Sequence, residues 1–286
     1  MKNPLLSIIL ILSAFLSFGQ EQEEGWSTQG NTQFLFNQAA FSNWVAGGEN
    51  SISGNLSFEY ELNYSKDKLT WNNNVMLSYG LAKVKNIGFE KKTDDRFEIN
   101  SLLGKWFRKN WHYSILFKFK TQFTKGFNYD KDENGKEIRT EYTSFMSPAN
   151  ILFGPGILWD KDKNLKVNIA PATGKIVIVD ADFTLPEGKY FGVEEGESTR
   201  LELGFNASLL YKFKLMKNVK MENRLEFYSN YLENIAHVDI DYLTKIKMKV
   251  NQHLSTNLIF HILYDDNAIA AVQLREVFGI GLNYEI

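Results

Sequence analysis

The stretch "WHYSILFKFKTQF", from Trp111 to Phe123, decides the fold because large apolar side chains recur at nearly every second position. Successive side chains of a β-strand point to opposite faces of the sheet. One face therefore holds Trp111, Tyr113, Ile115, Phe117, Phe119 and Phe123, and the other holds His112, Ser114, Lys118, Lys120 and Gln122. In a soluble sandwich the apolar face packs on a second sheet, whereas in a membrane barrel it faces lipid and the polar face lines the lumen.

The same alternation recurs in twelve segments of the chain. These segments are 26–36, 51–64, 68–81, 96–107, 111–124, 150–159, 165–179, 200–215, 219–231, 239–250, 254–264 and 272–286. Short polar turns such as "SKDK" and "RKN" alternate strictly with the longer stretches 37–50, 82–95, 125–149, 180–199, 232–238 and 265–271. Outer-membrane barrels have short periplasmic turns and longer extracellular loops. The sequence therefore predicts an all-β fold, a transmembrane antiparallel up-and-down β-barrel of about 12 strands, with a soluble exported β protein as the alternative.

Aromatic side chains flank the short turns, as Tyr64, Trp71, Phe107, Trp111 and Trp159 illustrate. Trp and Tyr gather at membrane–water interfaces, so this placement favours an interfacial girdle at the end that carries the short turns. The general frequency of aromatic residues in strands accounts for part of the clustering.

The N-terminal segment has the layout of an export signal, with Lys2 ahead of an apolar run from Leu5 to about Phe18. This layout predicts a cleaved signal peptide over residues 1–20 and a single outer-membrane barrel domain over 21–286. A membrane anchor is the alternative, although the run is somewhat short for a spanning helix. The absence of Cys excludes disulfides and lipid-modified cysteines. With 34 acidic and 32 basic residues, the chain carries no electrostatic footprint of nucleic-acid binding, and we expect no nucleic-acid partner. The predicted barrel implies contact with outer-membrane lipid and a possible small solute as partner.

Four further phrases stand out along the chain. They are "FNQAAFSNWVAGGENS" (36–51), "SPANILFGPGILW" (147–159), "APATGKIVIVD" (170–180) and "FGVEEGESTRLELG" (191–204). These phrases resemble landmarks of an uncharacterised family of Bacteroidota-type outer-membrane β-barrel proteins, known as a domain of unknown function. The resemblance spans nearly the whole chain after the signal segment. It implies a barrel of this topology in the outer membrane, and it implies no activity or catalytic residue.

The first of these phrases contains a loop of unusual composition. Phe41, Trp44 and Val45 would be costly in a fully solvated loop, and Gly47 and Gly48 allow a tight reversal before the second strand. Three interpretations stay open, namely a plug inside the lumen, an aromatic belt at the outer rim and a ligand site. The candidate plug or ligand residues are Phe41, Asn43, Trp44, Gly47 and Gly48.

The segment "DKDENGKEIRTE" fits a calcium-loop pattern, with Asp130, Asp132, Asn134, Gly135 and Glu141 at positions 1, 3, 5, 6 and 12. Its flanks are strands rather than helices, and "ENGK" carries the Asn-Gly signal of a tight hairpin turn. A hairpin is therefore favoured over a calcium site. The four His residues have no partner at metal-ligand spacing, so we expect no cofactor.

The alternation also predicts which charges point into the barrel. They are Lys212, Lys214, Lys220, Arg224, Lys247 and Lys249 on strands eight to ten, and Glu59 and Glu61 on strand two. Strand two lies opposite strand eight in a ring of twelve. Because positive groups outnumber negative ones on the predicted inner surface near the periplasmic end, an open lumen would weakly prefer anions. In the alternative, Glu222 and Glu226 help to neutralise the basic residues in a closed network.

The expected function is that of a pore, a small-solute transporter or a ligand-binding barrel. One alternative is a non-conducting barrel that acts as an assembly or anchoring partner. Another is an outer-membrane hydrolase, but the sequence contains no nucleophile elbow, phosphate-binding loop or zinc-protease motif, and we expect no catalytic residue.

Overall fold

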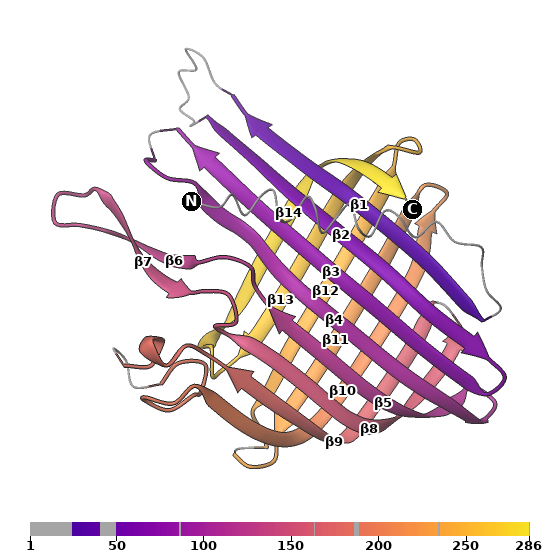
Figure 1. Cartoon of the computed structure of the whole chain (residues 1–286). Coiled ribbons are helices and arrows are strands. Elements are labelled where there is room, and N and C mark those ends of the chain that lie inside the picture. The colour runs from indigo at the N-terminus through magenta and orange to yellow at the C-terminus, as the bar shows by residue number, and fades with distance from the viewer. Residues whose placement is uncertain are drawn as a thin grey trace.

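Twelve β-strands close into one antiparallel barrel in the computed structural model, which describes residues 25–40, 50–85, 87–162, 164–185, 189–233 and 235–285 (Figure 1). The barrel strands are β1 (Trp26–Ala39), β2 (Ser51–Lys66), β3 (Leu69–Val84), β4 (Lys91–Arg108), β5 (Trp111–Thr121), β8 (Ala149–Asp162), β9 (Leu165–Ile178), β10 (Thr199–Met216), β11 (Val219–Asn230), β12 (Val238–Lys249), β13 (Leu254–Asp265) and β14 (Ile269–Glu285). Each pairs with its neighbours in chain order, and β1 closes the barrel against β14. The remaining strands, β6 (Gly126–Lys131) and β7 (Glu137–Thr143), form a separate two-stranded sheet.

The predicted fold class and all twelve predicted strand segments are confirmed. The ends differ by a few residues, most clearly at β4, which begins at Lys91, and at β5, which ends at Thr121. The Asp95 carboxylate explains the end of β5, because it accepts hydrogen bonds from the backbone N–H groups of Phe123 at 2.7 Å and Thr124 at 3.0 Å. These amides are bonded to a side chain instead of a neighbouring strand, so the ladder stops.

The two faces of the barrel wall differ in exposure as the alternation predicts. On β5 the outward Tyr113 and Ile115 are 61% and 57% exposed, whereas the inward Ser114 and Leu116 are 4% and 2% exposed. Continuous apolar surface of this kind is rare on soluble proteins and is typical of the lipid-facing band of a membrane barrel. The aromatic face of the opening stretch therefore points away from the barrel, and its lysines point inward.

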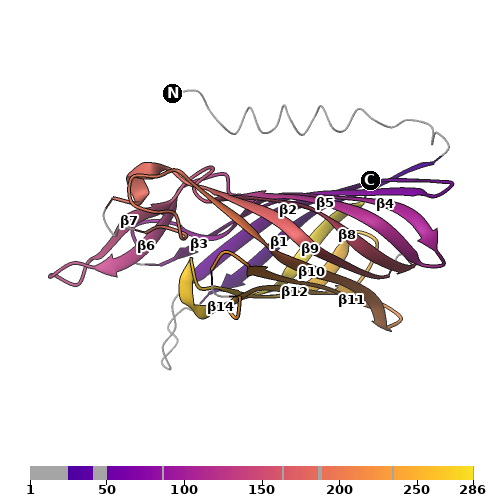
Figure 2. The same cartoon turned by 90° about the horizontal axis from the view of Figure 1, so that it is seen from below.

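The two ends of the barrel carry different connections. The short-turn end has the tight turns at 67–68, 109–110 and 217–218, and the opposite end is called the long-loop end here. Figure 2 shows β2, β4 and β5 in one wall and β11, β12 and β14 in the facing wall. Side chains that point inward from these two walls therefore face each other across the lumen.

An ordered segment that we call the cap lies beyond the long-loop end, where the β6–β7 sheet projects away from the barrel beside the 3-10 turn η1 (Ala181–Phe183) (Figure 1). Its buried centre is Tyr190, which packs with Val179 and Val193. The Tyr190 hydroxyl donates a hydrogen bond of 2.5 Å to the carbonyl oxygen of Tyr142 on β7. Within the described ranges, no helix is long and apolar enough to cross a membrane. The predicted signal peptide (1–20) and the loop residues 41–49 lie outside the described residues.

Candidate functional site in the lumen

Ion pairs join opposite walls of the lumen on its short-turn side. Glu59 on β2 accepts hydrogen bonds from Arg224 on β11 and, at 3.1 Å, from Nζ of Lys245 on β12. Glu61, two residues along β2, has a carboxylate oxygen 3.3 Å from Nζ of Lys212 on β10. These contacts connect β2 with three strands of the facing wall.

Glu222 links the two sets of contacts, because its carboxylate lies 3.3 Å from Lys212 and 2.7 Å from Arg224. We call the resulting network the lower cluster, and it consists of Glu59, Glu61, Lys212, Glu222, Arg224 and Lys245. Its side chains are 21% to 29% exposed. Charges at this depth are screened less than surface charges, but each is costly to leave without a partner.

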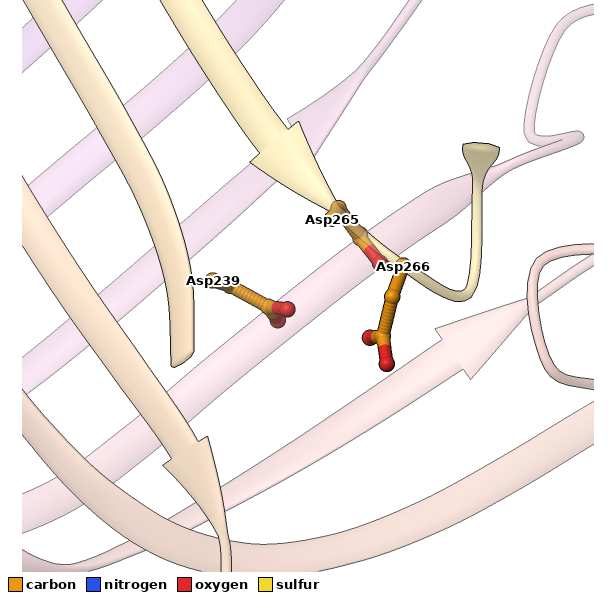
Figure 3. Close-up of side chains that lie close together, drawn as sticks. All are labelled: Asp239, Asp265 and Asp266. Carbon is orange, nitrogen blue, oxygen red and sulfur yellow. The ribbon is translucent and has the colours of Figure 1, made fainter. Parts of the chain in front are cut away.

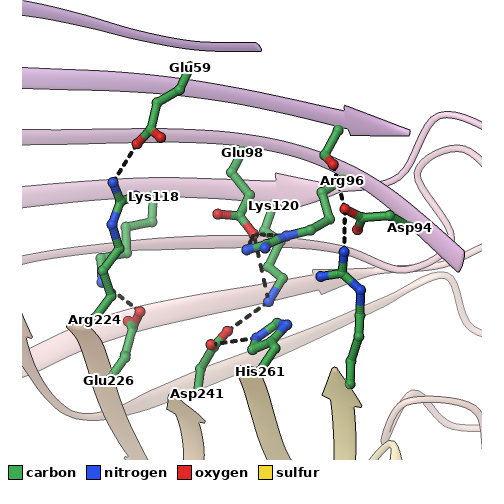
Figure 4. Close-up of polar contacts among 12 residues, drawn as sticks. Glu59, Asp94, Arg96, Glu98, Lys118, Lys120, Arg224, Glu226, Asp241 and His261 are labelled. Carbon is green, nitrogen blue, oxygen red and sulfur yellow. Dashed lines mark hydrogen bonds and ion pairs between the residues drawn. The ribbon is translucent and has the colours of Figure 1, made fainter. Parts of the chain in front are cut away.

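A second network crosses the lumen nearer the long-loop end (Figure 4). Lys118 on β5 pairs with Glu226 on β11 at 2.7 Å, and Lys120 pairs with Asp241 on β12 at 2.8 Å. Nε2 of His261 on β13 lies 2.8 Å from the other oxygen of Asp241. The lysines of the opening stretch therefore reach acidic groups on the far wall.

Further charges from β4 extend this network. Arg96 pairs with Glu98 at 2.7 Å, and Arg275 on β14 pairs with Asp94 at 2.6 Å. The Asp94 carboxylate also accepts a hydrogen bond of 3.0 Å from the Asn55 amide. The upper cluster, as we name it, consists of Asp94, Arg96, Glu98, Lys118, Lys120, Glu226, Asp241, His261 and Arg275.

Several inward-facing side chains besides the charged ones are shielded from water. Met76 and Leu243 are each 3% exposed, Leu116 is 2% exposed, and Leu158 and Asn206 are fully buried. In a wide aqueous channel, side chains that face the lumen remain accessible to water. Neighbouring side chains therefore cover these residues inside the lumen, as in small barrels with a packed interior.

Four of the eight lumen charges named from the sequence belong to the lower cluster: Glu59, Glu61, Lys212 and Arg224. Lys247 lies 3.4 Å from Glu285 near the short-turn end. Lys214, Lys220 and Lys249 are exposed, and they form no ion pair with the described residues. The candidate plug residues Phe41, Asn43, Trp44, Gly47 and Gly48 lie outside the described residues, so the proposed plug stays a prediction.

Most residues of the upper cluster were not among the site residues predicted from the sequence, although the sequence pattern indicates that some of them point inward. Arg96 and Glu98 alternate with Phe97 and Ile99 in a predicted strand, which puts both charges on the polar face. The alternation predicts the face but not the partner. The pairing of Arg275 with β4 depends on the way the two walls meet.

Three carboxylates gather at the long-loop end of the barrel (Figure 3). Asp239 comes from the start of β12, and Asp265 and Asp266 come from the end of β13 and the turn after it. Their ligand oxygens lie within 4.8 Å of one another. Lys175 neutralises part of the group, because it donates to Asp239 at 3.0 Å, and Nδ1 of His237 lies 2.6 Å from Asp266. We therefore assign to these three carboxylates a role in ion pairing at the long-loop end.

The segment considered as a calcium loop forms the favoured hairpin, since β6 pairs with β7 across it. Oδ1 of Asp132 accepts hydrogen bonds from the backbone N–H groups of Asn134 at 2.9 Å and Lys136 at 2.8 Å. The carboxylates of Asp130, Asp132 and Glu141 do not come together within metal-binding reach in the described structure. Asp132 stabilises the turn, and the hairpin prediction is confirmed.

A closed twelve-stranded barrel with an apolar outward face and a charged interior has the architecture of the outer-membrane β-barrel class. Residues 36–127 match a family model described as "Protein of unknown function (DUF3078)". This match includes the first of the four landmark phrases, and the other three lie outside it. No curated protein sequence matches the chain. The Bacteroidota-type lineage stays a prediction.

Solved outer-membrane barrels resemble the chain over nearly its full length. The translocator domain of the autotransporter NalP from Neisseria meningitidis is 10% identical, with a TM-score of 0.42 and coverage of 98% of this chain and 95% of that one. An outer-membrane channel from Pseudomonas putida F1 is 11% identical, with a TM-score of 0.41 and coverage of 94% and 97%. Outer membrane phospholipase A from Escherichia coli is 9% identical, with a TM-score of 0.38 and coverage of 95% and 96%.

Proposed function

We propose that this protein is an outer-membrane β-barrel that does not conduct solutes in its ion-paired form and that acts as an anchoring or assembly partner in the envelope. The apolar outward face and the alternation of short turns with long loops support the membrane location. By the same rule, the short-turn end faces the periplasm and the long-loop end faces the cell exterior.

The burial of inward-facing side chains is the observation that carries this proposal. Leu116 and Leu158 point into the lumen and are 2% and 0% exposed, so little water reaches them. The lower and upper clusters add charge pairs between the facing walls. A hydrated ion would have to separate these pairs and displace apolar side chains to pass.

The ordered cap supports the anchoring role. A barrel without a conducting lumen can still present a folded surface outside the membrane, and here the β6–β7 sheet and the buried Tyr190 provide one. The β6–β7 sheet has only two strands, so each of them keeps an unpaired edge. Such edges are ready sites for pairing with another chain.

A gated small-solute transporter is the second candidate, and the chemistry of the crossing groups favours it. The side chains of the lower cluster are charged and about a quarter exposed, rather than dry and apolar. Ion pairs in such surroundings exchange partners with passing ions more readily than fully buried pairs do. In this candidate function, a signal that breaks the pairs opens the lumen.

Solute entry into proteoliposomes tests the proposal. We expect the purified wild-type barrel to leave vesicles closed to small sugars and chloride. Replacing Glu59, Glu61 and Glu226 by Ala together removes acidic partners from both clusters, so the remaining cations repel one another and permeability should rise. The matched control is Glu90→Ala, which breaks an exposed pair with Lys83 and should leave the vesicles closed. Rapid solute entry through the wild-type barrel would favour the transporter and contradict the non-conducting proposal.

A further inference from the structure

A recess of about 500 Å³ hollows the outward face of the barrel where β5, β8 and β9 meet. Its walls are almost entirely apolar, and its main contributors are Trp111, Pro155, Ile157, Trp159, Ile169 and Pro171. The recess begins beside the tryptophans near the short-turn end and extends along the strands toward the middle of the wall. It is separate from the lumenal clusters, because its lining faces away from the barrel interior.

An irregularity in the sheet produces the recess. The pairing of β8 with β9 shifts register over residues 153–157 of β8. A Cβ atom added to Gly154 would lie only 2.6 Å from the carbonyl oxygen of Ala172, and one added to Gly156 only 2.6 Å from that of Ile169. These glycines point inward, so the backbone of β9 passes close against the lumenal side of β8. The register shift and this close backbone approach therefore coincide with the recess on the outer surface.

The recess suits a hydrocarbon chain because the protein backbone that lines it exposes few polar groups. Pro155 and Pro171 have no N–H to leave unpaired, and the carbonyl oxygen of Pro171 accepts a hydrogen bond of 2.9 Å from the Tyr231 hydroxyl. Unpaired backbone groups that face lipid are costly, so a bulge on a lipid-facing surface needs such compensation.

Two cations lie at the short-turn end of the recess. Arg108 on β4 is in register with Trp111 on β5, which is in turn in register with Trp159 on β8. Lys161 lies two residues beyond Trp159. Both cationic side chains are exposed, and neither forms an ion pair with the residues that the structure describes.

The nearest acidic groups are already engaged. Asp160 pairs with Lys166 at 3.1 Å, and Oδ1 of Asp162 accepts hydrogen bonds from the backbone N–H groups of Asn164 and Leu165. The positive charge of Arg108 and Lys161 is therefore available to an anionic group at the membrane surface.

We propose that this recess binds one anionic phospholipid of the periplasmic leaflet, with an acyl chain along the groove and the phosphate beside Arg108 and Lys161. The four steps along the strand from Trp159 to Pro155 span roughly 13 Å at about 3.3 Å per residue. Half of a hydrocarbon core is about 15 Å thick, so a chain of one leaflet fits this length. The inference rests on the proposed membrane location but not on the state of the lumen.

Native mass spectrometry of the folded barrel tests the inference, with phosphatidylglycerol and phosphatidylcholine of identical acyl chains added in detergent. We expect the wild type to retain one phosphatidylglycerol in preference to phosphatidylcholine. Arg108→Gln with Lys161→Gln should lower phosphatidylglycerol retention about fivefold for each charge removed. Ile169→Trp fills the recess and should lower the retention of both lipids.

The matched control is Lys66→Gln with Lys217→Gln, which removes two exposed cations at the same end of the barrel away from the recess and should change nothing. Equal loss of lipid in this control would overturn the inference, as would displacement of the lipid by inorganic phosphate alone. A folded, detergent-dependent barrel without lipid preference would contradict only this inference. A chain that is soluble without detergent would contradict the proposed membrane location.

Discussion

The pairing of Glu59 with Lys245 gives a quantitative test of the lower cluster. Glu59→Gln removes the carboxylate that accepts from Lys245 at 3.1 Å and leaves that ammonium group without its acidic partner. Arg224 is less affected, because it keeps Glu222 at 2.7 Å. The perturbation therefore removes both charge contacts of Glu59 with the facing wall, to Arg224 on β11 and to Lys245 on β12, and of the two cations only Arg224 keeps another ion pair among the described residues.

The expected size follows from the depth of the pair. Its side chains are 28% and 23% exposed, between a surface pair, worth about 0 to 1 kcal/mol, and a fully buried pair, whose breakage costs about 3–5 kcal/mol. We expect Glu59→Gln to lower the free energy of unfolding by about 1–2 kcal/mol. Lys245→Met should cost a similar amount, and the double variant should cost clearly less than the sum of the two.

Urea unfolding of the barrel in lipid vesicles, followed by Trp fluorescence, supplies the three differences for a double-mutant cycle. The matched control cycle uses Lys83→Met and Glu90→Gln, whose side chains pair at 2.9 Å but are 46% and 56% exposed. Its coupling energy should stay below about 0.5 kcal/mol. Additive effects of Glu59→Gln and Lys245→Met would refute the argument that this pair crosses the lumen.

Three other predictions concern the wall, the cap and the lumen mouth. Leu209→Arg places a charge on the lipid face and should destabilise the barrel by roughly 2–4 kcal/mol near the bilayer midplane. The inward Ser208→Arg should cost much less, and equal costs of the two variants in urea unfolding would contradict the register. Tyr190→Phe removes the hydroxyl that donates to a β7 carbonyl and should loosen the cap by about 1 kcal/mol, measured as faster hydrogen exchange there and unchanged exchange in the barrel. In any conducting form, Lys247→Glu with Lys249→Glu should shift the reversal potential in a salt gradient toward cation selectivity, and an unchanged potential would place these lysines outside the conducting path.

The sequence predicted the barrel well because strand alternation and turn length are local properties. The outward aromatic face of "WHYSILFKFKTQF" follows from a period of two, and the order of short and long connections follows from counting residues. Each of these signals needs only the residues next to one another in the chain. This is why the strands and their faces agree with the structure while their exact ends differ by a few residues.

The partners across the lumen could not be predicted in the same way. Counting around a ring of twelve puts strand two opposite strand eight, and Glu61 does meet Lys212 there. Glu59, on the same face, instead reaches Arg224 and Lys245 on the next two strands. Strand tilt and the close approach of the two walls determine these contacts. The alternation of apolar and polar residues predicts neither of them.

The recess depends on a further nonlocal feature. Pro155 and Pro171 are visible in the sequence and mark irregular strands, because proline cannot donate to the ladder. They do not reveal how closely the backbone of β9 approaches Gly154 and Gly156 on β8. That approach depends on the contact between the backbones of two strands.

Accessibility of single cysteines to a membrane-impermeant thiol reagent tests the closed lumen most directly, because the chain contains no Cys of its own. Leu116→Cys places a thiol on an inward position that is 2% exposed, and Lys249→Cys places one on an exposed inward position at the short-turn end. With the barrel in vesicles and reagent on both sides, we predict rapid modification at position 249 and none at position 116 while the barrel stays folded. Rapid modification at position 116 would show that water and solute reach the middle of the lumen, and it would contradict the closed barrel.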